Sequence, residues 1–216
     1  MHIQETKKIS INSDLTSKYT AFPLRGRRAG KKFLKNLLDF VFPRVCINCK
    51  TLIGKDYFGQ NLCSICYSQI EEIAPPYCEI CCKPFILETE YQRICSDCKK
   101  IQPFYRFLYS AAEYNNEVIN KLILSFKYSG KYFLARDMAM YMLQMLEKNS
   151  GRLDLNTIDY VVPVPLYYRK KRERGYNQSE LLGEYVAKFA NLNFNGDILL
   201  RKRDTESQTE LNFKMR

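Results

Sequence analysis

The residues of this chain that are best suited to chemistry are its cysteines. Eight of the nine cysteines form four Cys-x-x-Cys pairs, which are Cys46/Cys49, Cys63/Cys66, Cys78/Cys81 and Cys95/Cys98. The last two pairs lie 32 residues after the first two, so the segment is an internal duplication. A Cys-x-x-Cys turn directs two thiolates at one point about 2.3 Å away, and two such turns complete a tetrahedral Zn²⁺ site. The spacing therefore predicts two structural zinc sites.

Other uses of these cysteines fit less well. A redox dithiol needs one pair near a βαβ unit, whereas this chain has four pairs in tandem. Disulfides need an oxidising compartment, and we recognise no signal peptide ahead of the pairs, so we expect a cytoplasmic protein. Cys82, the ninth cysteine, is expected to pack or to stay free. The ligands could also be cross-braced between the copies, but the duplication favours self-contained copies because an ancestral single unit had to fold with its own four ligands.

Composition limits the possible organisation and partners. The 216 residues allow one mid-sized domain and a small one, and no apolar run is long enough to predict a membrane span. The net charge of +11 is localised: residues 1–45 carry +7 and residues 169–174 carry +4. Such basic segments indicate an anionic partner, either nucleic acid or a polyphosphate substrate. A solvated basic face is the alternative interpretation.

The chain divides by composition into four parts. Residues 1–30 are polar, basic and without period, which predicts a disordered tail. Apolar residues at helical spacing before Pro43 predict a short docking helix within residues 31–45. The double-zinc module follows over residues 46–102, and the second domain occupies residues 103–216.

The second domain reads as an α/β arrangement. Strands are predicted at residues 105–113, 158–162 and 198–200 from their aromatic and branched side chains. Two amphipathic helices lie between the first two strands, separated by Ser129-Gly130. A third helix begins at Asn177, where Asn177 and Glu180 resemble a capping box. The order strand, loop, helix, strand predicts a parallel βαβ unit whose ligand site lies at the carboxyl ends of its strands.

Four collinear stretches together resemble the ComF family. The first is the cysteine block with its leading helix, and the second is Leu124-Ser125-Phe126-Lys127-Tyr128-Ser129-Gly130. The third consists of two segments, Val162-Pro163-Val164-Pro165-Leu166 and Arg172-Glu173-Arg174-Gly175-Tyr176-Asn177-Gln178. The fourth is Arg203-Asp204-Thr205-Glu206-Ser207-Gln208. The resemblance implies a small N-terminal zinc-ribbon-like module followed by a parallel-sheet domain similar to type I phosphoribosyltransferases. Such enzymes also carry an acidic pair and a Thr-Thr-Gly-type turn downstream, which this sequence lacks, so we expect a C-terminally truncated domain that is inactive alone and does not bind phosphoribosyl pyrophosphate tightly.

The resemblance also assigns residues to a ligand site. A pyrophosphate loop would contain Pro163, Val164, Pro165, Leu166, Arg169, Arg172, Arg174, Gly175, Asn177 and Gln178, and a flexible loop would contain Thr205, Ser207 and Gln208. A turn before a helix start and planar arginine side chains both suit phosphate oxygens. Mg²⁺ would accompany phosphoribosyl pyrophosphate. Tyr167 and Asp204 stand where the family usually has histidines, so no proton-transfer role passes to either residue.

Two classes of function follow. The first is a phosphoribosyltransferase-like protein that binds phosphoribosyl pyrophosphate or pyrophosphate and is linked to DNA uptake (competence), DNA processing or nucleotide metabolism. The second is a non-catalytic zinc-containing module that binds nucleic acid, such as single-stranded DNA, or recruits a partner such as a DNA-uptake helicase. The sequence identifies no catalytic nucleophile or general base, and His2, the single histidine, lies in the predicted tail.

Overall fold

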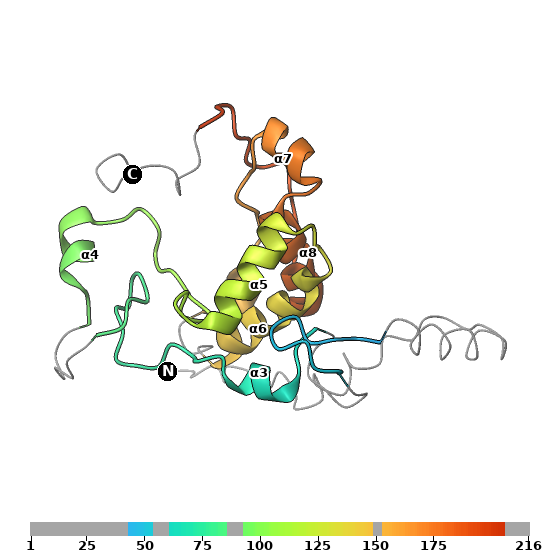
Figure 1. Cartoon of the computed structure of the whole chain (residues 1–216). Coiled ribbons are helices and arrows are strands. Elements are labelled where there is room, and N and C mark those ends of the chain that lie inside the picture. Colours follow the sequence, from blue (N-terminus) through green and yellow to red (C-terminus); the bar gives the residue numbers. More distant parts are fainter. Residues whose placement is uncertain (1–42, 54–60, 86–92, 149–152, 206–216) are drawn as a thin grey trace. The chain divides into compact units, whose positions relative to one another are not determined.

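The computed structural model describes residues 43–53, 61–85, 93–148 and 153–205 (Figure 1). The chain divides into two units, Met1–Ser68 and Gln69–Arg216, and each is considered by itself. The second cysteine copy therefore belongs to the same unit as the helices that follow it. The tail expected over residues 1–30, most of the docking helix expected within residues 31–45, and Ser207 with Gln208 lie outside the described residues.

The first cysteine copy folds as a small ribbon. Its hairpin is closed by an antiparallel bridge between Val45 and Leu52, and the Cys46 amide donates to the Thr51 carbonyl at 2.8 Å. Lys50 occupies the turn with a φ of 66°, a left-handed conformation that lets the chain reverse tightly. The second pair of cysteines follows at the start of α3 (Ser64–Ser68).

The second copy repeats this backbone with the same offset of 32 residues. Tyr77 and Pro84 form its antiparallel bridge, and the Cys78 amide donates to the Lys83 carbonyl at 2.9 Å. Cys82 takes the position of Lys50, with a φ of 60°. Its last pair of cysteines flanks the start of α4 (Ser96–Ile101). The duplication read from the sequence is thus a duplication of structure.

The predicted strand at residues 105–113 is wrong. No ladder forms there in the described part of the chain, and the Leu108 amide instead donates to the Ile80 carbonyl at 2.6 Å. The aromatic composition that favoured a strand instead belongs to an irregular connection whose Phe104 and Tyr105 are exposed. Strand propensity needs a neighbouring strand to act on, and this segment has none among the described residues.

The three predicted amphipathic helices are confirmed as α5 (Glu117–Tyr128), α6 (Leu134–Lys148) and α8 (Gln178–Ala190). Asn116 caps α5 by accepting from the Val118 and Ile119 amides, and Val118, Leu122 and Phe126 form its buried face. Gly130, with a φ of 64°, provides the reversal between α5 and α6. None of the helices in the described ranges is long and apolar enough to cross a membrane.

Helices α6 and α8 pack along one another and α5 lies against α6 (Figure 1). Their buried positions include small residues, Ala135 and Ala139 on α6 and Gly183 and Ala187 on α8. Small side chains allow two helix axes to approach closely. This helical layer forms the core of the second unit.

The expected parallel sheet is reduced to one bridge in the described residues. Val161 pairs in parallel with Phe194: its amide donates to the Asn193 carbonyl at 2.8 Å and its carbonyl accepts from the Asn195 amide at 3.1 Å. The chain passes from Val161 to Phe194 through α8, so the parallel direction of the bridge matches the βαβ prediction. The parallel-sheet domain itself is not confirmed. A short 3₁₀ helix, η1 (Leu155–Thr157), precedes the bridge.

The strand predicted at residues 198–200 is misplaced. Pairing occurs at Phe194, and the chain then turns because the Asn195 side chain accepts from the Asp197 amide at 2.9 Å. Ile198, Leu199 and Leu200 consequently remain exposed. The apolar run that indicated a buried strand therefore has no sheet neighbour in the described structure.

Gly183 tests the contact between α8 and the bridge. A Cβ atom at Gly183 would lie 3.0 Å from Cε2 of Phe194, a contact so tight that the ring would have to shift by a few tenths of an ångström. We expect Gly183→Ala to lower the free energy of unfolding by about 1–2 kcal/mol, because overpacking outweighs the better helix propensity of alanine. Denaturant unfolding measures this change.

The matched control is Gly196→Ala, whose Cβ would meet the same ring at an ordinary 3.5 Å. It should change stability by no more than about 0.5 kcal/mol. In a Phe194→Leu background, Gly183→Ala should become neutral or stabilising. A Gly183→Ala protein more stable than the parent would contradict the close contact.

Candidate functional site

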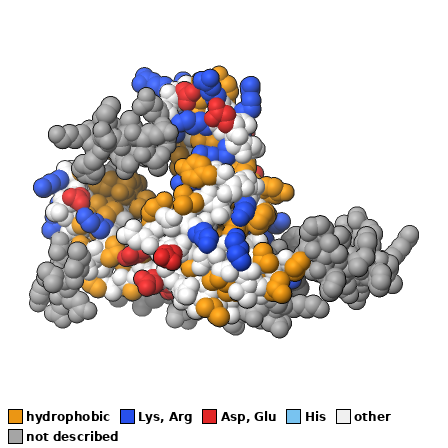
Figure 2. All heavy atoms as spheres, in the orientation of Figure 1, with side chains coloured by type: hydrophobic (Ala, Val, Ile, Leu, Met, Phe, Trp, Pro, Cys, Tyr) orange, Lys and Arg blue, Asp and Glu red, His pale blue; other side chains and the backbone are white. Residues whose placement is uncertain are grey.

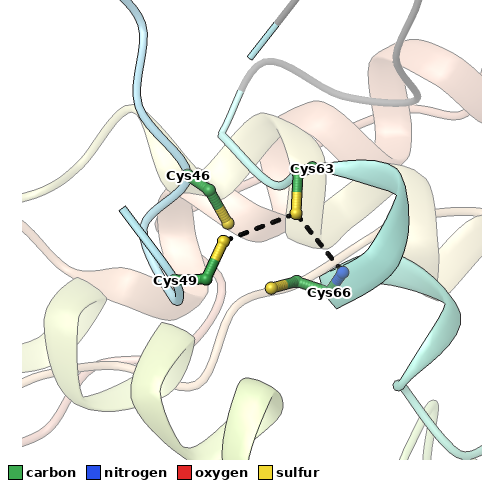
Figure 3. A group of neighbouring side chains, drawn as sticks. All are labelled: Cys46, Cys49, Cys63 and Cys66. Carbon is green, nitrogen blue, oxygen red and sulfur yellow. Dashed lines mark hydrogen bonds between the residues drawn. The ribbon is translucent and has the colours of Figure 1, made fainter. Parts of the chain in front are cut away.

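The four sulfur atoms of the first ribbon converge on one point (Figure 3). They lie within 4.8 Å of one another, and the Cys49 and Cys63 sulfurs are 3.6 Å apart. Four sulfurs bound tetrahedrally to zinc at about 2.3 Å would stand about 3.8 Å from each other. Cys46, Cys63 and Cys66 are buried and Cys49 is exposed. This donor set fits a closed structural Zn²⁺ site.

The second ribbon repeats the arrangement. Cys78, Cys81, Cys95 and Cys98 also lie within 4.8 Å of one another, with 3.7 Å between the Cys81 and Cys95 sulfurs. Ile80, Phe85 and Ile94 pack against the buried cysteines of this site. Each group contains the cysteines of one copy, so the sequential pairing is confirmed and the cross-brace alternative is wrong. None of the nine cysteines forms a disulfide, and buried Cys82 stands outside both groups.

The metal-free thiols differ in how readily they ionise. Hydrogen bonding with the Thr51 side chain lowers the pKa of Cys49 to about 6. Burial raises the pKa of Cys66 to about 12 and also raises that of Cys98. Burial opposes ionisation of Cys78 as well, but hydrogen bonds from backbone amides lower its pKa to about 6. Zinc must therefore displace protons from the high-pKa ligands, and zinc affinity should rise with pH.

The predicted pyrophosphate loop contains a helix that the sequence did not indicate. Pro163 is buried and Val164 is exposed, but the chain then enters α7 (Tyr168–Arg174), which carries Arg169, Arg172 and Arg174. Gly175 ends this helix with a φ of 85°, and its amide donates to the Lys171 carbonyl. The expectation that these arginines lie on a loop is therefore corrected, because they lie on about two turns of helix.

Several α7 cations have partners within the protein. Arg169 lies 3.9 Å from both Glu173 and Asp204, and Lys171 forms a 2.7 Å ion pair with Glu180. Lys170 donates to the Thr205 carbonyl at 2.7 Å. In Figure 2 the Lys and Arg side chains around α7, at the top of the view, are accordingly interspersed with acidic side chains. These pairs join α7 to α8 and to the segment that leads into the predicted flexible loop.

Arg172 differs from the other α7 cations. It is exposed, and it makes no ion pair with the residues that the structure describes. Arg174 is directed inward instead: it donates to the Gln178 Oε1 atom at 2.7 Å and lies over the Tyr128 ring at 5.5 Å from the centroid. The arginines that the sequence grouped together therefore have different surroundings.

Tyr176 anchors the segment between α7 and α8. Its hydroxyl donates to the Phe126 carbonyl near the end of α5, and the two rings lie 5.7 Å apart. Burial raises the pKa of the Tyr176 hydroxyl, so this donor keeps its proton at neutral pH. The two sequence stretches at residues 124–130 and 172–178 are thus in direct contact. Sequence reasoning missed this role of Tyr176, since an aromatic residue beside a glycine gives no signal of its partner.

Asn177 and Gln178 are buried at the start of α8. Asn177 caps the helix by accepting from the Ser179 amide at 3.1 Å, and its own amide donates to the Val164 carbonyl at 3.2 Å. The predicted capping role is confirmed, but Glu180 pairs with Lys171. The Gln178 Nε2 atom is buried without a hydrogen-bond partner in the described structure. Buried donors without a partner are uncommon in folded proteins, and a ligand or an ordered water can satisfy them.

Metal content tests the two sulfur sites. We expect two zinc ions per chain, and Cys63→Ser should reduce the content to about one because the first site loses a ligand. Structural zinc contributes about 10–16 kcal/mol to such modules, so the first ribbon should also unfold. Elemental analysis of the purified protein measures the change. Cys82→Ser is the control and should retain two ions; a parent protein with one zinc or none would refute the assignment.

Comparisons with known proteins agree with this geometry. A family model described as a double zinc ribbon domain matches residues 37–99. Competence protein F of Haemophilus influenzae is 28% identical over 79% of this chain and 71% of its own length. The DNA utilization proteins YhgH of Escherichia coli and of Salmonella typhimurium are 25% identical over 81% of this chain and 74% of theirs. No solved structure matches the chain significantly. The two self-contained Cys₄ ribbons, the collinear motifs that follow them and the similarity to these relatives together support the resemblance to the ComF family.

Proposed function

We propose that this protein takes part in the uptake or utilisation of DNA and that its second unit binds a diphosphate group at the start of α8. The link to DNA rests on the names of its relatives, a competence protein and DNA utilization proteins. The ligand would be pyrophosphate, free or as part of phosphoribosyl pyrophosphate. The two ribbons have a structural role in this proposal, because their sulfur sites are closed and leave zinc no open position.

The position of the turn before α7 and α8 carries the proposal. Residues 162–167 leave the parallel bridge at Val161, and α8 returns the chain to Phe194. Ligands of parallel α/β units bind outside the carboxyl ends of the strands, next to a helix N-terminus. The buried Gln178 Nε2 atom, which has no hydrogen-bond partner in the described structure, lies in the first turn of that helix. A polyanion at this point would meet the positive end of the helix dipole.

Charge around this turn supports the same ligand. Arg172 is exposed and can bind phosphate oxygens directly, with its planar guanidinium matching two of them. The Arg169 guanidinium lies 3.9 Å from the Asp204 carboxylate. An incoming phosphate could approach Arg169 more closely and replace Asp204 as its partner. Mg²⁺, which binds phosphate oxygens, would accompany the diphosphate. Phosphoribosyl transfer would be a more specific function than diphosphate binding, and no residue is assigned to it as nucleophile or base.

Pyrophosphate binding provides the test. Calorimetry on the full chain with Mg²⁺ and pyrophosphate should show saturable binding, and Arg172→Ala should weaken it about tenfold or more, the loss of one charge-assisted contact. Lys188→Ala is the matched control, because it removes the same charge from the last turn of α8. It should leave the affinity within about twofold, since the effect of a helix terminus is confined to its first turn.

Two results would refute the site. One is the absence of pyrophosphate binding by a protein that contains both zinc ions. The other is an equal loss of affinity in the Arg172 and Lys188 variants, which would indicate general attraction to a cationic surface. Phosphoribosyl pyrophosphate in place of pyrophosphate then shows whether the ribose adds affinity.

A second candidate is non-catalytic binding of single-stranded DNA. It is favoured by the two basic segments, +7 over residues 1–45 and +4 over residues 169–174. Each phosphate neutralised on a single strand contributes a slope of about −0.7 in the logarithm of affinity against the logarithm of salt concentration. Phosphate contacts alone would give binding that is independent of sequence.

Salt dependence tests this candidate. Affinity for an oligonucleotide should fall steeply with salt, and deletion of residues 1–30 should flatten the slope, as should Arg172→Ala with Arg174→Ala. Fluorescence anisotropy at several salt concentrations gives the slopes. Unchanged slopes in both variants, or no binding at low salt, would show that the basic segments are solvated faces only.

A further inference from the structure

Aromatic side chains gather on the surface at the turn between α5 and α6. Tyr128 is 61% exposed, Tyr132 63% and Phe133 48%, whereas nearby Phe126 is 2% exposed. Large aromatic side chains usually bury most of their area, and three exposed within six residues are unusual for a surface without a ligand. These three rings are therefore only partly buried in the second unit.

Neighbouring groups hold this cluster in place. Tyr132 packs edge-to-face on Phe133 at 6.2 Å and on Tyr176 at 6.4 Å between ring centroids. The Arg174 guanidinium lies over the Tyr128 ring, while the same side chain donates to Gln178. The rings are therefore fixed before any ligand arrives, which lowers the entropic cost of stacking a further planar group on them. Arg174 also connects the cluster to the start of α8.

Cations predominate in the sequence around the rings. Residues 118–136 contain four Lys or Arg residues and no acidic residue, and Lys127 beside Tyr128 is exposed. Exposed aromatic rings interleaved with cations are the combination that binds single-stranded nucleic acid: the rings stack bases and the cations follow the phosphates. Single-stranded nucleic acid offers both planar bases and phosphates along one chain, so this complementarity favours nucleic acid.

We propose that Tyr128 and Tyr132 form a stacking surface for unpaired bases of single-stranded DNA, with Lys127 and Lys131 beside the adjacent phosphates. This inference rests on the DNA-binding candidate described above and adds to it a contact with the bases. It also predicts a preference for single strands, because the bases of a duplex are stacked on each other and unavailable. Stacking tolerates any base, so binding remains largely independent of sequence.

Oligonucleotides with and without bases separate stacking from charge. We expect the full chain to bind dye-labelled oligo(dT) more tightly than an abasic strand of the same length and charge. The double variant Tyr128→Ala, Tyr132→Ala should lose about tenfold or more in affinity for oligo(dT), in line with the effect of one or two stacked bases. Its affinity for the abasic strand should be unchanged. Anisotropy at fixed salt measures both affinities.

Two control variants accompany the measurement. Tyr128→Phe with Tyr132→Phe keeps both rings and should retain oligo(dT) affinity within about twofold. Tyr114→Ala removes a tyrosine of similar exposure, 55%, that precedes the opposite end of α5, and it should have no effect. Zinc content and thermal unfolding of each variant show that it is folded.

The outcomes distinguish this inference from the proposed function. Equal affinities for oligo(dT) and the abasic strand, or an alanine variant that binds like the parent, would overturn the stacking surface while leaving phosphate binding intact. Failure to bind either strand would overturn both the DNA-binding candidate and the stacking surface. Pyrophosphate binding is tested separately by calorimetry and would not be affected by that result.

Discussion

Convergence of four thiolates on one point is the constraint on which each ribbon depends. The buried cluster of the second ribbon is composed of Cys78, Cys95 and Cys98, with a few apolar side chains packed against it. Segments this short cannot bury enough apolar surface to offset the loss of chain entropy, so a metal must supply the difference. The same hydrogen bonds recur at an offset of 32 residues, for example Cys46 to Thr51 and Cys78 to Lys83, because each copy must present the same tetrahedron.

In the second unit the corresponding constraint is the attachment of the segment after α7 to the end of α5. Tyr176 donates to the Phe126 carbonyl and Arg174 lies over Tyr128, so the start of α8 is fixed relative to α5. The neighbouring cations of α7 are balanced by Glu173, Glu180 and Asp204 through exposed pairs, which contribute little stability. The start of α8 is therefore held rigidly. The α7 cations, in contrast, can exchange a carboxylate partner within the protein for a phosphate at a small cost in free energy.

The sequence predicted what depends on local spacing. The cysteine offset defined both sulfur sites, and the Asn177 cap and the helical periods located α5, α6 and α8. It failed where the outcome depends on a distant neighbour. Residues 105–113 have strand composition but no strand beside them among the residues that the structure describes. Residues 198–200 do not pair because the chain turns at Asn195 after the bridge at Phe194. The stacked rings of Tyr132 and Tyr176 join residues 44 positions apart, which no local pattern encodes.

Amide hydrogen exchange with and without magnesium pyrophosphate tests the central claim most directly, because it locates the ligand on the chain. The account predicts slower exchange at the non-proline residues of 162–167 and in the first turn of α8, where ligand oxygens would accept from backbone amides. Peptides from residues 43–68 should be unaffected and serve as an internal reference. Protection confined to the ribbons, or no change around α8 at saturating pyrophosphate, would contradict the account.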